Sequence, residues 1–201
     1  MKSWRLGGGS GTWADRVYEA LRRGVNRRLV EYLKRNALSR HGGKVLEAGS
    51  GTAGASSLLA SAPDVFGVAL DADIDALKEA RRRDPALPVV AGDVYRLPFK
   101  EGVFDLVWNS STVEHLEDPG PALAEMARVV ARNGHVFVGV PYRRGPLGFQ
   151  SLISKTAVGV WLGPAFSRAE LLDGMRRACL EPVGTVYYFF HVFIGVLSRK
   201  S

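Results

Sequence analysis

The sequence predicts an α/β fold in which a mostly parallel sheet carries helices on both faces. Short apolar, β-branched runs alternate with helical patterns between residues 44 and 141, and repeated strand–helix–strand units make parallel neighbours. Glycine and polar residues follow directly after several of these runs, as they do where strands of an open sheet end at a ligand site. The chain has 201 residues and is 46% hydrophobic, which suits one globular domain with a substantial core.

An amphipathic helix is expected near the N-terminus. Its apolar positions recur every four residues and leave arginines on the other faces: Trp13, Val17, Leu21, Val25, Leu29 and Leu33. The run His41-Gly42-Gly43 ends this helical region.

The elements that follow can be assigned in order. Strands are expected over residues 44–48, 64–70, 87–91, 104–108 and 135–140, with two closing strands over about 182–189 and 192–199. Helices are expected over residues 52–62, 73–83, 119–132 and from Ser167 to about Cys179. Ser167 and Glu170 have the spacing of a capping box. Residues 142–164 are longer than an ordinary loop, so we expect an insertion that serves as a lid or binding element.

Charge is distributed unevenly along the chain. Residues 1–44 hold eleven Lys and Arg but only three acids, so this stretch has a net charge of +8. The whole chain has a net charge of +7, so the remaining residues are nearly neutral. We therefore expect a basic helical extension over residues 1–43, followed by a catalytic α/β domain over residues 44–201. Such an extension could contact an anionic membrane, a nucleic acid or an acidic substrate, or it could simply be a solvated helix face.

Several classes of protein and site are disfavoured by composition. The single cysteine, Cys179, cannot form an intramolecular disulfide, and no His, Asp or Glu cluster has metal-ligand spacing, so no metal site is expected. The first eleven residues lack the apolar core of a signal peptide, and no apolar run is long enough to span a membrane. We expect a cytoplasmic protein, with peripheral membrane contact as an option through the basic helix.

Candidate site residues lie at the ends of four expected strands. They are Glu47, Ala48, Gly49, Ser50 and Gly51 at the first strand, Asp71 and Ala72 at the second, Asp93 and Val94 at the third, and Asn109 at the fourth. Because the carboxyl ends of parallel strands meet at one edge of a sheet, these side chains should converge there. Asp73 and Asp75 compete with Asp71 for its role, and one of them is expected to cap the next helix.

The residue types at these strand ends point to a particular cofactor. The glycine pattern alone also fits a nicotinamide dinucleotide, but the carboxylate of Glu47 would sit badly beside a pyrophosphate. It would sit well beside the cationic amino group and sulfonium of S-adenosylmethionine (SAM). In such a site Asp71 accepts from two ribose hydroxyls, Asp93 accepts from the adenine amine near the Val94 amide, and Asn109 borders the methionine part.

A set of motifs resembles a known family. The motifs, in order, are residues 47–54, Asp71, Gly92-Asp93-Val94 with Leu97-Pro98-Phe99, Phe104-Asp105-Leu106-Val107, residues 113–119 and residues 122–129. Together they are similar to the small-molecule branch of class I SAM-dependent methyltransferases, which includes the ubiquinone and menaquinone C-methyltransferases and related lipid methyltransferases. The resemblance covers about residues 44–141. It implies a Rossmann-like seven-stranded sheet, mostly parallel with the last strand antiparallel, and S-adenosyl-L-homocysteine as the product of SAM.

Two departures from the family pattern bear on the acceptor. The usual Lys-Pro-Gly-Gly turn is here Ala131-Arg132-Asn133-Gly134, which still has good turn chemistry. The Tyr-Asp signature of the quinone enzymes is absent around residues 13–18, which argues against a quinone acceptor.

The acceptor pocket should lie between the N-terminal helix, the insertion at 142–164 and the end of the fourth strand. Transfer from a sulfonium is an in-line displacement, so the protein mainly orients the reactants. A phenol or enol would benefit from a base, and His115 is the candidate, unless it is a structural histidine beneath the cofactor loop. Apolar residues beside cations in the insertion suit a small apolar or amphiphilic acceptor, such as a lipid or a prenylated aromatic acid.

The sequence is also compatible with functions other than methyl transfer to a small molecule. The same fold could bind SAM without turnover, because SAM chemistry requires no obligatory catalytic residue. An RNA acceptor is another alternative and would exploit the basic helix. A nicotinamide-dependent oxidoreductase is disfavoured by Glu47, by Asp93 and by residues 113–119.

Overall fold

The computed structural model describes residues 13–38, 42–146 and 163–201, with the side chains of the first helix described from Asn26 onward. Residues 1–12 of the expected extension and most of the expected insertion, residues 147–162, lie outside the described residues. No helix among the described residues is long and apolar enough to cross a membrane.

The centre of the molecule is a seven-stranded sheet with the order β3-β2-β1-β4-β5-β7-β6. Its strands are β1 (Gly43–Ala48), β2 (Val65–Asp71), β3 (Val89–Ala91), β4 (Phe104–Ser110), β5 (Val130–Pro141), β6 (Leu180–Tyr188) and β7 (Phe193–Lys200). The neighbours from β3 to β5 are parallel, whereas β7 is antiparallel to both β5 and β6. The expected fold class is confirmed, including the antiparallel last strand.

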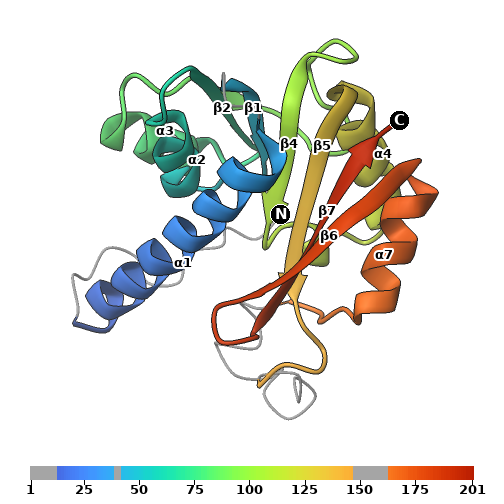
Figure 1. Ribbon diagram of the computed structural model, residues 1–201. Helices are drawn as coiled ribbons and strands as arrows, with labels where there is room; N and C mark the ends of the chain where they lie inside the picture. Colours follow the sequence, from blue (N-terminus) through green and yellow to red (C-terminus); the bar gives the residue numbers. More distant parts are fainter. Residues whose placement is uncertain (1–12, 39–41, 147–162) are drawn as a thin grey trace.

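Helices cover both faces of this sheet (Figure 1). They are α1 (Trp13–Ala37), α2 (Gly54–Ala60), α3 (Ile74–Arg83), α4 (Pro119–Val129) and α7 (Arg168–Arg177), with a short 3-10 helix η1 (Val113–His115) after β4. On one face, Leu29 and Leu33 of α1 pack in a core that includes Trp108 and Phe137 of the sheet. On the other face, α4 and α7 pack with Val107 and neighbouring strand residues. The described end of α1 therefore shares its core with the sheet.

Hydrogen bonds at the helix termini explain where several helices begin. The Asp73 side chain accepts from the amides of Asp75 and Ala76, so Asp73 is the residue that caps α3. The expected capping box is confirmed: Ser167 accepts from the Glu170 amide at 3.2 Å, and Glu170 accepts from the Ser167 amide at 2.8 Å.

Some boundaries differ from those expected. The helix expected to reach residue 132 ends at Val129, because Val130 already pairs with Phe104 of β4. Cys179 does not lie in a helix but follows α7 in a left-handed conformation, with φ 58°. His191 lies outside the strands, in the turn between β6 and β7, where three consecutive residues have positive φ. Short-range patterns locate these elements, but pairing with distant strands sets their ends.

Candidate functional site

The loop after β1 contains two glycines in backbone conformations that other residues rarely adopt. Gly49 and Gly51 have φ values of 84° and 54°, which favour glycine. A Cβ atom on Gly49 would collide with the side chain of Thr112. The amides of Gly49 and Ser50 donate to the Leu70 carbonyl at 2.8 and 2.9 Å, which attaches the loop to β2.

Glu47 is buried at the carboxyl end of β1 and has hydrogen-bond donors of its own. One carboxylate oxygen accepts from the Ser56 amide at 3.1 Å and from the Ser56 hydroxyl. Ser56 lies in the first turn of α2, where main-chain amides lack helical partners. Glu47 therefore fixes the start of α2 relative to β1.

Asp71 ends β2 and connects two loops. Its Oδ2 accepts from the Gly51 amide at 2.6 Å, and its Oδ1 accepts from the Asp73 amide at 2.8 Å. Asp71 is half-buried, and the following residue, Ala72, is exposed. The competing roles proposed for Asp71 and Asp73 are thus separated: Asp73 caps α3, and Asp71 faces the glycine loop.

Asp93 lies beyond β3, next to the end of β2. The Gly92 amide donates to the Asp71 carbonyl at 3.0 Å, which brings the two strand ends together. Asp93 is exposed and accepts from the Tyr95 amide at 2.9 Å, whereas Val94 packs against the core. These expected site residues therefore meet at one edge of the sheet.

The end of β4 and the loop after β1 hold buried polar atoms that lack hydrogen-bond partners in the described part of the chain. The Asn109 side chain is 1% exposed and donates its Nδ2 to the Ala48 carbonyl, which links β4 to β1. Among the described residues, neither Asn109 Oδ1 nor the nearby hydroxyl of Ser50 has a hydrogen-bond partner. Buried polar groups are normally satisfied, so unsatisfied ones at a strand end indicate a ligand site.

Glu114 is a candidate site residue that the sequence analysis did not single out. It lies on η1, is 3% exposed, and neither carboxylate oxygen has a hydrogen-bond partner among the described residues beyond the nearby amide of Glu114 itself. Burial raises the pKa of this carboxyl well above its usual range. The available signal was an acidic residue within the motif at residues 113–119, but the neighbouring His115 drew the catalytic interpretation.

His115 also lies on η1 and is half-buried. Burial lowers the pKa of its imidazole, which favours the neutral form that can accept a proton. A Cβ atom on Gly163 would lie 2.7 Å from His115 Cε1 and 2.9 Å from Glu114 Cγ. The described end of the expected insertion therefore packs directly on η1.

Tyr188 extends the site to β6. Its hydroxyl lies 2.9 Å from Ser110 Oγ at the end of β4. Burial raises the pKa of the Tyr188 phenol strongly, and the charge of Glu114 raises it further. Ser110, Glu114 and Tyr188 thus form a polar group within otherwise apolar surroundings.

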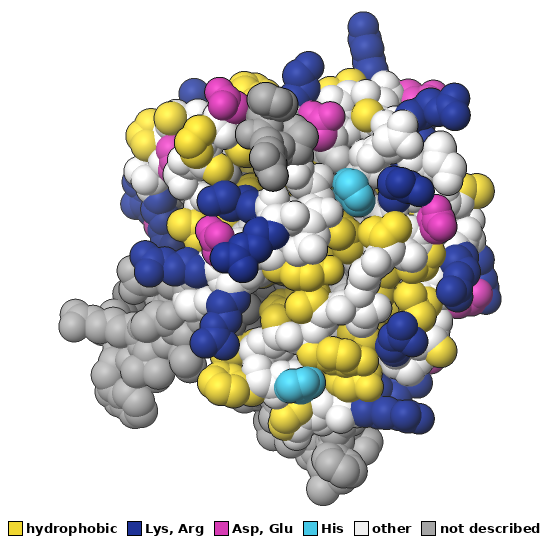
Figure 2. Space-filling view, in the orientation of Figure 1, with side chains coloured by type: hydrophobic (Ala, Val, Ile, Leu, Met, Phe, Trp, Pro, Cys, Tyr) yellow, Lys and Arg dark blue, Asp and Glu magenta, His cyan; other side chains and the backbone are white. Residues whose placement is uncertain are grey.

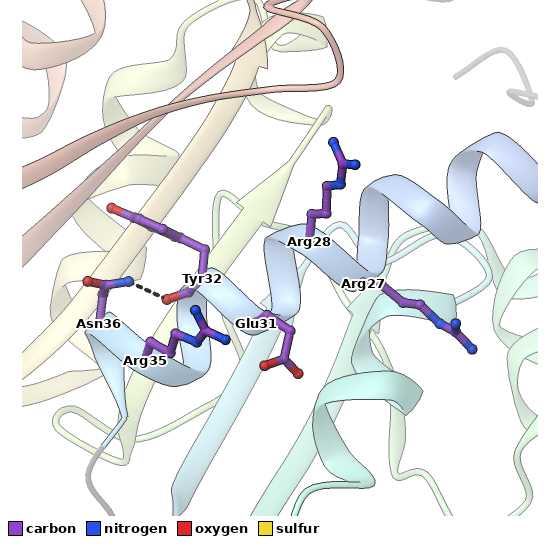
Figure 3. A pocket seen from close by; sticks show the side chains of 6 residues that line it. All are labelled: Arg27, Arg28, Glu31, Tyr32, Arg35 and Asn36. Carbon is purple, nitrogen blue, oxygen red and sulfur yellow. Dashed lines mark hydrogen bonds between the residues drawn. The ribbon is translucent and has the colours of Figure 1, made fainter.

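A separate feature is a hollow of about 420 Å³ on the described end of α1 (Figure 3). Its side chains project from successive turns of the helix: Arg27, Arg28, Glu31, Tyr32, Arg35 and Asn36. Lys and Arg side chains gather over this part of α1, and also over α7 at the opposite edge (Figure 2). We call the hollow the α1 basic groove.

The part of the chain that the structure describes contains no group of three or more His, Cys, Asp or Glu that could hold a metal ion. The donor set at the strand ends instead combines carboxylates, main-chain amides and an unsatisfied amide oxygen.

Residues 46–138 match the sequence model of a methyltransferase domain family. Demethylmenaquinone methyltransferases from Renibacterium salmoninarum and Streptomyces avermitilis are 40% and 35% identical over 98 and 95 residues. These alignments cover 48% and 47% of this chain but only 40% and 41% of the relatives. A SAM-dependent methyltransferase from Thermotoga maritima has the same fold, with a TM-score of 0.74, 24% identity and 94% coverage of both chains. The domain match places a methyltransferase domain in residues 46–138, and the strand order and the structural similarity give the chain the fold of class I SAM-dependent methyltransferases.

Proposed function

We propose that this chain transfers a methyl group from SAM to a small apolar or amphiphilic acceptor, bound at the end of β4 beside the described ends of the expected insertion, residues 142–146 and 163–164. The observation that carries this proposal is the set of buried polar atoms that have no hydrogen-bond partner among the described residues, beside a loop with two glycines at positive φ. SAM, when bound, supplies an activated methyl group on a sulfonium. The protein then has to bind the two reactants, orient them for transfer and exclude water.

The strand-end residues fit the polar groups of SAM. Each oxygen of Asp71 accepts one main-chain hydrogen bond, which leaves a second lone pair for a ribose hydroxyl. Asp93 offers a carboxylate at the neighbouring strand end, near Val94, for the adenine amine. Buried Glu47 adds negative charge beside the glycine loop, which suits the cationic methionine end.

His115 and Asn109 would act at the reacting end of the site. Asn109 Oδ1 is a buried acceptor aligned by the bond from Nδ2 to β1, so it can orient a donor on the cofactor or the acceptor. Burial lowers the pKa of His115, so its neutral imidazole can accept a hydrogen bond at this end of the site.

Calorimetry of SAM binding tests the cofactor part of the proposal. The wild-type chain should bind SAM, and Asp71→Ala should weaken binding about 10–100-fold, because a hydroxyl acceptor and the bond that orients Gly51 are both lost. Asp75→Asn is the matched control, since Asp75 is an exposed acid on α3. Equal affinity for SAM in both variants, or no SAM binding by folded wild-type protein, would refute the assignment.

We further propose that the α1 basic groove contacts an anionic membrane and so brings the site to an amphiphilic acceptor. The groove has three arginines against one acid, and Tyr32 packs beside Gly184 of β6. On β6 and in the following turn, Val183, Tyr187 and Phe190 are exposed apolar side chains. Cations next to exposed apolar side chains suit the surface of a membrane that contains anionic lipids.

Vesicle sedimentation tests the membrane contact. Binding to vesicles with phosphatidylglycerol should fall with salt, and Arg27→Ala/Arg28→Ala/Arg35→Ala should weaken it about 100-fold, at about 1 kcal/mol per cation. The control is Arg81→Ala/Arg82→Ala/Arg83→Ala on α3, which removes the same charge elsewhere. Equal losses in both variants would contradict the proposal. Salt-dependent RNA binding without vesicle binding would instead assign the groove to nucleic acid.

A further inference from the structure

The carboxyl group of Glu114 has no role in holding the fold together that the described contacts can explain. It is buried on a 3-10 helix of three residues, and no described side chain donates to either of its oxygens. Burying a carboxyl without partners costs several kcal/mol in the ionised form, so a structural position would favour an apolar residue. An unsatisfied buried carboxyl therefore points to a ligand that completes it.

The position of η1 places this carboxyl at the candidate site. Thr112, two residues before Glu114, donates its hydroxyl to the Gly49 carbonyl at 3.0 Å and so ties η1 to the glycine loop. Gly163 packs against Glu114 from the side of the insertion. Glu114 thus lies on a short helix that is bonded to the glycine loop through Thr112 and contacts the described end of the insertion through Gly163.

The titratable groups around Glu114 do not neutralise it. Tyr188 of β6 is near enough to interact with it and is itself buried and protonated, and its hydroxyl pairs with Ser110 of β4. His115, next in the chain on η1, has its charged form disfavoured by burial. No cation among the described residues offsets the burial of the Glu114 carboxyl. Within the part of the chain that the structure describes, the ionised carboxylate has no compensating charge, and a cationic ligand would supply one.

We propose that Glu114 is the proton acceptor of the reaction and that the acceptor substrate is a protic nucleophile, a hydroxyl, enol or neutral amine. This inference rests on the proposed function. The cationic cofactor favours the ionised carboxylate, which then accepts the proton of the nucleophile. Acceptors without a transferable proton, such as tertiary amines and thioethers, do not need this group.

The charges and atoms of this step balance. A lone pair of the nucleophile forms a bond to the methyl carbon, the methyl carbon–sulfur bond breaks, and its electron pair stays on sulfur. For an enol, the attacking pair comes from the enol carbon. The O–H or N–H proton passes to a carboxylate oxygen of Glu114. One positive and one negative charge before transfer become a neutral thioether and a neutral carboxylic acid, which suits a site with little water.

Calorimetry tests this assignment without turnover. SAM and S-adenosyl-L-homocysteine are titrated from pH 5 to pH 8 in two buffers of different ionisation enthalpy, with wild type, Glu114→Gln and Glu117→Gln. In wild type, binding of the cationic SAM should cause Glu114 to release a proton. Binding of S-adenosyl-L-homocysteine, whose sulfur is uncharged, should cause a smaller proton release. The affinity ratio for SAM over product should rise with pH, by at most about tenfold per unit.

The variants decide the outcome. Glu114→Gln should bind both compounds with a pH-independent ratio, whereas Glu117→Gln, an exposed neighbour, should behave like wild type. The inference is overturned if Glu114→Gln releases as many protons as wild type when SAM binds. It is also overturned if His115→Gln, and not Glu114→Gln, abolishes this proton release. Wild-type binding of both compounds without proton linkage also overturns it while leaving the proposed function intact. No SAM binding by folded wild-type protein overturns both. Circular dichroism verifies that each variant is folded.

Discussion

At the scale of single residues, two buried glutamates behave in opposite ways. Glu47 is satisfied by the amide and hydroxyl of Ser56, and so contributes to the junction of β1 and α2. Glu114 is equally buried but lacks such donors among the described residues. Glu47 therefore supports the fold at the end of β1, whereas Glu114 on η1 is the residue that we propose to meet a ligand.

The raised pKa of Glu114 predicts a pH-dependent effect on stability. In the unfolded chain this carboxyl ionises near pH 4.3, whereas burial keeps it protonated to higher pH in the folded chain. Its stabilising contribution is present below that unfolded value and is lost as pH rises through the folded pKa. Glu114→Gln should therefore be more stable than wild type at neutral pH, with the difference vanishing near pH 4.

Thermal unfolding from pH 4 to pH 8 measures this difference. Glu117→Gln serves as the control, since its side chain is exposed and should change the melting temperature little at any pH. A Glu114→Gln variant that is less stable than wild type at pH 7 would mean that the carboxyl has structural donors after all.

At the scale of elements, the helices depend on local caps that the sequence makes visible. Ser167 and Glu170 satisfy each other's amides, and Glu170 also accepts from Arg143 at 2.9 Å. This ion pair joins the start of α7 to the segment just after β5. The cap therefore positions both a helix and one end of the region assigned to the acceptor.

Removing the cap should weaken the start of α7. Ser167→Ala is expected to lower the free energy of unfolding by about 1 kcal/mol, because the Glu170 amide loses its acceptor. Ser167→Asp should restore most of this stability, since aspartate is an equally good capping residue. Urea unfolding followed by circular dichroism measures both variants, and equal stability of Ser167→Ala and wild type would show that the cap contributes nothing.

At the scale of the whole molecule, α1 and the sheet form one hydrophobic core. Leu33 is fully buried in the cluster that contains Trp108 and Phe137. A helix that shares its core with a sheet should unfold together with it.

A cavity in this core should therefore destabilise the entire domain. Leu33→Ala is expected to cost about 2–5 kcal/mol, whereas Arg28→Ala on the exposed face of α1 should cost within about 0.5 kcal/mol. Urea unfolding is followed in parallel by far-UV circular dichroism and tryptophan fluorescence. Two separate transitions for the helix and the sheet would contradict a shared core.

Much of the architecture could be predicted from the sequence because its signals are local. Alternating apolar runs placed every strand of the sheet, and the spacing of Ser167 and Glu170 located the start of α7. Asp71 and Asp93 could be identified as neighbours because parallel strands end at one edge. Helix and strand ends were less accurate: Val130 belongs to β5 because it pairs with Phe104, a contact invisible to a local pattern.

By itself, the sequence determined the order of the strands and helices, the glycine loop after β1 and the carboxylates at the strand ends. Only the tertiary structure decided which of these polar groups are satisfied. Asp73 caps α3, and Glu47 accepts hydrogen bonds from Ser56. Glu114 is buried and has no described side-chain donor. Tyr188 reached Ser110 across 78 residues of chain. Burial and hydrogen-bond satisfaction depend on residues far apart in sequence, so the group proposed to accept the proton became visible only in the folded chain.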